Sequence, residues 1–162
     1  MDSKRKGSKR KPIAAFRRPR NSLGHLLWQA HRGWQRHLEA SLEALGLIHA
    51  QFVLLTMIQY LESEGEKPSQ SRLASFLRFE QMMVSQSLRA LEERGYLRRQ
   101  PHPDDPRANQ IGLTKSGLLL ASRAAAIAEA AEAKFFEALG AQRPALAEML
   151  RATLDSNAPI QK

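Results

Sequence analysis

The chain has 162 residues, of which 43% are apolar and 25% are charged, so it is long enough and apolar enough to bury the core of one domain. It contains no cysteine, which excludes disulfides, thiolate metal sites and cysteine nucleophiles. This suits a reducing compartment, and we expect a cytoplasmic protein. The sequence contains no apolar run of about 18 residues, so we expect neither a membrane-spanning helix nor a membrane partner.

The net charge of +9 is unevenly distributed along the chain. The first 20 residues hold nine Lys and Arg against one Asp, a net charge of +8, and the remainder carries only +1. This pattern predicts a disordered basic arm at residues 1–20 on a nearly neutral body. Such arms usually bind polyanions, nucleic acid before acidic membrane. The alternatives are an unstructured solubilising leader and an overlong start of the sequence.

The first part of the body is predicted to be helical. Apolar residues recur at helical spacing over residues 21–46, where Asn21 or Ser22 can cap the helix. A second helix is predicted at residues 49–61, and because it is apolar on most sides it is expected to form the core. The polar stretch 62–68 is expected to be a loop.

Two short helices and a hairpin are predicted next. Ser69 is expected to cap a helix at 70–77, and a second helix at about 80–94 is expected to end before Gly95. Strands are predicted at 96–100 and 110–113, on either side of a proline-rich loop at 101–109. Thr114 then caps an alanine-rich helix to residue 139, closed by Gly140, and a last helix is expected at 142–154. The fold class is therefore mainly α with a small β-hairpin, in the order of a winged helix-turn-helix at residues 47–113.

The outward face of the helix at 80–94 is the main functional signal. Val84, Leu88 and Leu91 share one face and must point inward. A solvated face is usually rich in Lys and Glu, whereas the opposite face here offers short polar groups, glutamines and a methionine. Gln can pair with adenine through two hydrogen bonds, and an apolar tip can contact the thymine methyl group. The alternative is a polar helix that covers a small bundle. The predicted base-contacting residues are Gln81, Met82, Met83, Ser85, Gln86 and Arg89.

The hairpin is predicted to supply a second contact. Arg107 lies near its tip, where Asp105 can orient the guanidinium group and prolines stiffen the loop. An arginine held in this way suits the narrow, electronegative minor groove of DNA. Arg98 and Arg99, at the base of the hairpin, are expected to contact phosphates.

These segments together resemble the MarR family of bacterial transcriptional regulators. The matching segments are LGLIHAQFVLL (45–55), SQSRLASFL (69–77), MMVSQSLRALEERGYLRR (82–99) and PDDPRANQIGLTKSG (103–117). The last segment is the most specific. In it, an Asp and an Arg separated by one residue precede a strand that ends in Leu-Thr. With the flanking helices, the resemblance covers about residues 21–157.

The resemblance implies a homodimer in which the helices at 21–46 and 114–157 intertwine as a dimerisation base. Each protomer would present one recognition helix and Arg107 to a pseudo-palindromic operator with half-sites about 10 base pairs apart. The implied function is sequence-specific DNA binding, most simply repression. The sequence contains no phosphate-cradling glycine loop and no nucleophile elbow, so we expect neither a cofactor nor enzymatic activity. A lone protomer would expose the apolar side chains of the dimerisation base: Leu23, Trp34, Phe135, Phe136, Leu146 and Leu150.

The sequence departs from the family pattern at three points. Ile48 stands where Ser or Thr usually caps the second helix, which weakens that cap. Pro106 stands where a second wing arginine is common, so one minor-groove charge is missing. The basic arm is longer than usual and is a candidate to offset that loss.

The sequence also allows other interpretations. His25, His31 and His37 are six residues apart, which rotates each by about 240° on a helix, so no metal site is expected. Many relatives bind small aromatic anions, and Trp28, His31 and Trp34 are the candidate ligand residues, with simple packing as the alternative. Two other functions stay open: an architectural protein that coats DNA without sequence preference, and a winged-helix protein-interaction module that uses Met82 and Met83.

Overall fold

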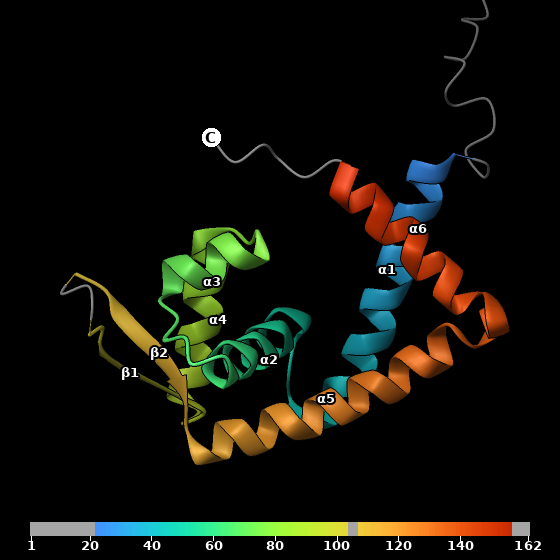
Figure 1. Ribbon diagram of the computed structural model, residues 1–162. Helices are drawn as coiled ribbons and strands as arrows, with labels where there is room; N and C mark the ends of the chain where they lie inside the picture. Colours follow the sequence, from blue (N-terminus) through green and yellow to red (C-terminus); the bar gives the residue numbers. More distant parts are fainter. Residues whose placement is uncertain (1–21, 104–106, 157–162) are drawn as a thin grey trace, which may run out of the picture. The chain divides into compact units, whose positions relative to one another are not determined.

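The computed structural model of the protein describes residues 22–103 and 107–156 (Figure 1). The expected arm at 1–20, the candidate cap Asn21, and Asp105 and Pro106 of the wing lie outside the described residues. The chain divides into two compact units, and the boundary falls between Gln35 and Arg36, within the first helix.

The first unit contributes the beginning of helix α1 (Leu23–Leu42). Its apolar side chains Leu23, Leu26 and Trp28 are exposed, and the ring of His25 stacks on Trp28 with centroids 5.9 Å apart. The predicted helical pattern is therefore confirmed for this segment, although its apolar positions are not covered within the unit.

The second unit is built around helix α2 (His49–Ser63), which follows the end of α1 and the 3₁₀ turn η3 (Glu43–Leu45). Its residues Leu54, Leu55 and Ile58 are completely buried, as expected for the core helix. Ile48 provides no side-chain cap. Instead, the Oε1 atom of Gln51 accepts a hydrogen bond from the Ile48 amide at 3.3 Å, which satisfies one amide at the helix start.

Helices α3 (Gln70–Leu77) and α4 (Gln81–Glu93) form the helix-turn-helix. Ser69 caps α3 as predicted, since its Oγ accepts a hydrogen bond from the Arg72 amide at 3.2 Å. The predicted inward face of α4 is confirmed by the buried side chains Val84, Leu88 and Leu91. Figure 1 shows α4 between α3 and α2, and it packs against both helices.

The hairpin consists of strands β1 (Leu97–Pro101) and β2 (Asn109–Leu113), paired antiparallel with Leu97 opposite Leu113. Both strands are displaced or extended by one residue from the prediction, because Pro101 pairs with Asn109. The loop expected at 62–68 begins later than predicted, because α2 continues to Ser63. It also takes part, since the Ile111 amide donates to the Pro68 carbonyl at 2.8 Å. The wing is thereby joined to the segment that leads into α3.

The C-terminal part of the unit contains α5 (Lys115–Phe135), the 3₁₀ turn η4 (Glu137–Gln142) and α6 (Arg143–Ser156). The Thr114 cap is confirmed by a 3.0 Å hydrogen bond from the Gly117 amide to its Oγ1. The predicted end of α5 at residue 139 is wrong, because the helix stops at Phe135. Phe135 packs edge-on against Phe136 at 4.9 Å and lies 5.6 Å from His37. Gly140 then adopts a φ of +48°, which favours glycine and turns the chain into α6.

Taken singly, none of the described helices is both long and apolar enough to cross a membrane, although α1 and α2 would pass that test if counted together.

Candidate nucleic-acid interface

The exposed face of α4 carries the residues that the sequence placed there. Met82 is 72% exposed, and Gln81, Gln86 and Arg89 are exposed as well. The side chains of the two glutamines and of Arg89 have no hydrogen bond or ion pair with any other described residue. A helix face with these polar groups unpaired is available to an outside partner.

Two further predicted residues of α4 are less accessible. Met83 and Ser85 are half-buried, because they lie between the outward face and the inward face marked by Val84. Their predicted contacts with bases stay predictions, and the structure places them at the edge of the exposed face.

The wing extends beyond its two strands. The His102 amide donates to the Ala108 carbonyl at 3.0 Å, and Nε2 of Gln110 donates to Oε1 of Gln100 at 3.0 Å. Arg107 lies at the tip, next to this ladder, and its side chain is exposed. The ladder therefore holds the Arg107 backbone close to its last rung, whereas its predicted partner Asp105 lies outside the described residues.

The two arginines at the base of the wing differ from each other. Nε of Arg99 lies 2.9 Å from Oε2 of Glu92, so this ion pair ties β1 to α4. Arg98 is exposed and faces Glu62, whose carboxylate accepts a hydrogen bond from the Leu113 amide at 3.3 Å. Arg98 is therefore the more available of the two for an outside anion.

The carboxylate of Glu62 lies close to the backbone of strand β2, at Gly112 and Leu113. Burial raises the pKa of Glu62, and the Leu113 hydrogen bond and the Arg98 charge oppose that shift. A Cβ atom at Gly112 would lie 2.9 Å from Oε1 of Glu62, a shorter distance than Cβ atoms in proteins normally keep from other atoms. The glycine in β2 thus makes room for the carboxylate.

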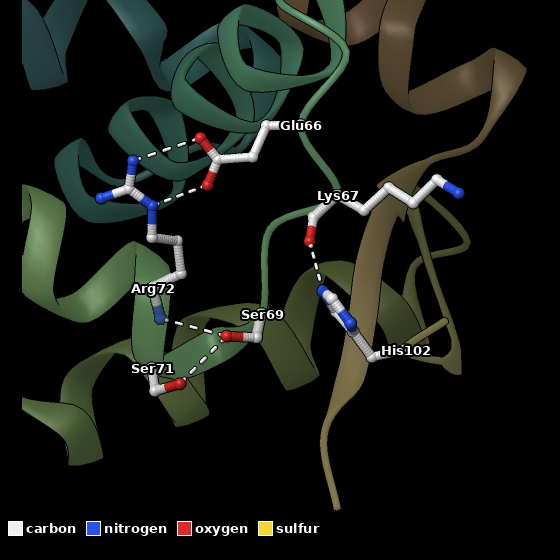
Figure 2. A network of polar contacts seen from close by, with 6 residues as sticks. All are labelled: Glu66, Lys67, Ser69, Ser71, Arg72 and His102. Atoms are coloured by element: carbon white, nitrogen blue, oxygen red, sulfur yellow. Dashed lines mark hydrogen bonds and ion pairs between the residues drawn. The ribbon is translucent and has the colours of Figure 1, made fainter. Parts of the chain in front are cut away.

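A polar network fixes the wing to the start of α3 (Figure 2). Arg72 pairs with Glu66 through two hydrogen bonds of 2.6 and 3.2 Å, which lowers the pKa of Glu66. The ring Nε2 of His102 lies 3.0 Å from the Lys67 carbonyl, and Ser69 caps the helix between these contacts. The loop before α3 therefore links the helix-turn-helix to the hairpin.

The turn after α4 contains functional candidates that the sequence did not indicate. Nη1 of Arg94 donates to the Gly46 carbonyl at 2.8 Å, and Nη2 donates to the Leu45 carbonyl at 3.1 Å. These partners are 48 and 49 residues away in the sequence. No local spacing could have shown this contact.

The same turn also explains the Leu-Thr-x-x-Gly segment at the start of α5. The Thr114 and Ser116 hydroxyls donate to the Gly95 carbonyl at 2.8 and 3.0 Å, and the Thr114 amide donates to Tyr96. Gly117 packs so closely on the Tyr96 backbone that a Cβ atom would collide with the Tyr96 carbonyl. The segment thus locks the wing onto α5.

The residues predicted for dimerisation are only partly exposed. Leu23 is 84% and Leu150 is 39% exposed, as expected. The expectation that a lone protomer exposes the other four is met only in part, because these side chains are half-buried within the chain: Trp34, Phe135, Phe136 and Leu146. The two phenylalanines lose exposure because they pack on each other.

The candidate ligand residues lie on α1. Trp28 is 60% exposed, His31 is exposed and Trp34 is half-buried. Across the part of the chain that the structure describes, no three His, Asp or Glu side chains are grouped so that they could hold a metal ion.

A helix-turn-helix followed by a hairpin that pairs with the entry to its first helix defines a winged helix-turn-helix. The MarR family model matches residues 47–108, which run from the start of this module to the tip of the wing, just before β2. The HTH-type transcriptional regulator YdcH of Bacillus subtilis is 41% identical over 123 residues, which cover 76% of this chain and 84% of the relative. The chain belongs to the MarR family of transcriptional regulators.

Solved structures share this fold. Rv2887 of Mycobacterium tuberculosis, crystallised with salicylic acid, is 29% identical with a TM-score of 0.65, covering 82% of this chain and 96% of that one. A cysteine-to-serine mutant of MarR from Escherichia coli, crystallised with operator DNA, is 22% identical with a TM-score of 0.71, covering 82% of this chain and 92% of that one.

Proposed function

We propose that the protein is a homodimeric transcriptional repressor that binds a pseudo-palindromic operator in the bacterial cytoplasm. Helix α4 enters the major groove of each half-site, and Arg107 enters the adjacent minor groove. The observation that carries this proposal is the exposed face of α4, where Gln81, Gln86 and Arg89 have no partner among the described residues.

The chemistry of this face suits base edges. Met82 and Gln86 are four residues apart and therefore lie on the same side of α4. Gln86 can donate to and accept from adenine, while the exposed Met82 tip can contact a thymine methyl group. Arg89 follows one turn nearer the C-terminus and can reach a guanine or a phosphate.

The wing and the arm add charge to this interface. Arg107 at the tip suits the narrow minor groove, and Arg98 at the base can reach a phosphate. The basic residues 1–20 would strengthen binding to any duplex by releasing counterions. Sequence preference is therefore assigned to α4, and much of the general affinity to the wing and arm.

The exposed apolar residues of α6 favour pairing with a second copy. No residue of α6 is buried within the chain, and Met149 and Leu154 are 66% and 68% exposed. A helix with such a face usually packs against another surface. A two-fold dimer would place two copies of α4 about one DNA turn, or roughly 10 base pairs, apart.

The test is a selection of bound duplexes from random DNA with the purified full-length protein. Affinities for the selected duplex and a scrambled duplex are then compared over a salt series. We expect a two-fold-related motif and a clear preference for it at every salt concentration. Equal affinity for both duplexes would refute the proposal and favour an architectural DNA-coating protein. Absence of binding even at low salt would favour a protein-interaction module.

A ligand-dependent release of the operator is part of the proposal. The structure of the relative Rv2887 contains salicylic acid, and Trp28 is an exposed aromatic side chain on α1. A small aromatic anion would lower DNA affinity by binding best to a dimer whose recognition helices are wrongly spaced. Titration with salicylate should quench tryptophan fluorescence and release the selected duplex, and Trp28→Leu should weaken both effects. Unchanged DNA affinity at saturating salicylate would refute this ligand.

A further inference from the structure

We propose that Arg94 is a positioning residue that sets which separation of half-sites the protein accepts. It would do so by fixing the end of the recognition helix α4 against the end of the α1–η3 segment. This inference rests on the proposed function, because a preferred separation exists only if a dimer binds two half-sites.

The guanidinium group of Arg94 makes three contacts. Its two terminal nitrogens donate to the successive carbonyls of Leu45 and Gly46, at 3.1 and 2.8 Å. Its central carbon lies 5.0 Å from the centroid of the Tyr96 ring. Hydrogen bonds fix the edge of the planar group, and the aromatic ring supports its face.

The carbonyls that Arg94 contacts lie where the α1–η3 segment ends. The last carbonyls of a helix lack partners within it and carry partial negative charge, so a cation is favoured there. Gly46 turns the chain with a φ of +61°, and a Cβ at this position would lie 3.3 Å from Nη2 of Arg94. The turn conformation and the arginine contact therefore fit each other closely.

The next two residues of the same turn anchor α4 to α5. The Gly95 carbonyl accepts the hydroxyls of Thr114 and Ser116, and the Tyr96 carbonyl accepts the Thr114 amide at 3.1 Å. Residues 94–96 thus contact both the end of the α1–η3 segment and the start of α5. In the proposed dimer these are the two connections between the winged module and the dimerisation base. Packing on α2 and α3 orients α4 within the winged module, and this turn ties the end of α4 to both connections.

Other arginines of the module have different environments. Arg72 and Arg99 pair with Glu66 and Glu92, within the winged module. Arg89 has no partner among the described residues and faces outward. Arg94 differs from these three because it reaches across to the η3 turn.

The experiment uses duplexes that carry two copies of the selected half-site, with their separation changed one base pair at a time. Wild-type protein should bind one separation best. For Arg94→Gln, we expect the ratio of best to neighbouring separations to fall about tenfold, the factor equivalent to about 1.4 kcal/mol. Affinity for a duplex with a single half-site should not change, because the base-contacting face remains intact.

Two variants serve as comparisons. Arg94→Lys keeps the charge and one possible hydrogen bond, so it should retain part of the discrimination. Arg123→Gln loses the same charge from an exposed position on α5 that has no hydrogen bond or ion pair with other described residues, and it should behave like the wild type.

An unchanged separation profile for folded Arg94→Gln would overturn the inference even if the protein binds its operator specifically. If Arg94→Gln does not fold, Tyr96→Leu removes only the ring support and should flatten the profile in the same direction, and an unchanged profile there overturns the inference. Equal binding of the wild type to selected and scrambled duplexes would instead be the failure of the proposed function, and the inference would fall with it.

Discussion

Replacing Gly117 by alanine tests the contact that locks the wing onto α5. An alanine inside a helix is ordinarily favourable by about 0.5–1 kcal/mol relative to glycine. Here the added Cβ would lie 2.9 Å from the carbonyl carbon of Tyr96 and still closer to its oxygen. These atoms belong to the backbone, so no side chain can rotate away, and α5 must move relative to the hairpin.

The expected cost exceeds the helix gain. Overpacking of this kind usually costs about 1–3 kcal/mol. The movement would also weaken the 3.1 Å hydrogen bond from Thr114 to Tyr96, worth about 0.5–1.5 kcal/mol. We therefore expect Gly117→Ala to lower the free energy of unfolding by about 1–3 kcal/mol net. For a domain of this size that corresponds to a Tm lower by about 2–4 °C per kcal/mol.

The assay is urea unfolding followed by circular dichroism, at one fixed protein concentration because a dimer's stability depends on it. Gly24→Ala is the matched control, since the nearest atom to its Cβ would be the Ser22 Oγ at 4.0 Å. This control should be as stable as the wild type or slightly more stable. If Gly117→Ala were equally stable, the close contact between α5 and Tyr96 could not be a constraint on the fold.

Three further predictions concern the interface and its support. Gln86→Ala should relax base preference at one operator position by about 1–3 kcal/mol, measured by binding to single-base variants, whereas Glu93→Ala at the end of α4 should not. Arg107→Ala should weaken operator binding strongly while sedimentation still shows a dimer; unchanged affinity would remove the wing arginine from the interface. Because burial raises the pKa of Glu62, the folded state disfavours the charged carboxylate. Glu62 therefore contributes stability below the usual glutamate pKa, and this contribution is lost as the pH rises through the raised pKa. Glu62→Gln should therefore flatten the stability profile just above the usual glutamate pKa and stabilise the protein at neutral pH; a steeper profile would contradict this.

Local patterns in the sequence predicted the structure correctly where residues a few positions apart determine it, as in the buried face of α4 and the caps of α3 and α5. The period of 3.6 residues predicted that Val84, Leu88 and Leu91 point inward, and all three are buried. The caps at Ser69 and Thr114 were predicted because their partners are the amides three residues later, Arg72 and Gly117.

The end of α5 could not be found in this way. Alanines and other good helix formers continue to residue 139, so propensity alone favours a longer helix. The helix stops at Phe135 because its ring packs against Phe136 and lies beside His37, almost a hundred residues earlier in the chain. Packing energy from a distant element outweighs the small propensity differences between single residues.

The sequence by itself determined the order of elements and the polar character of the exposed α4 face, because both depend on the spacing of residues a few positions apart. Only the tertiary structure decided which arginine side chains remain available to contact DNA. Arg94 and Arg99 are as basic in sequence as Arg89 and Arg98, yet Arg94 is bound to the Leu45 and Gly46 carbonyls and Arg99 to Glu92. Which acceptor an arginine binds depends on which groups the fold brings close to it, and for Arg94 these groups lie 48 and 49 residues away along the chain.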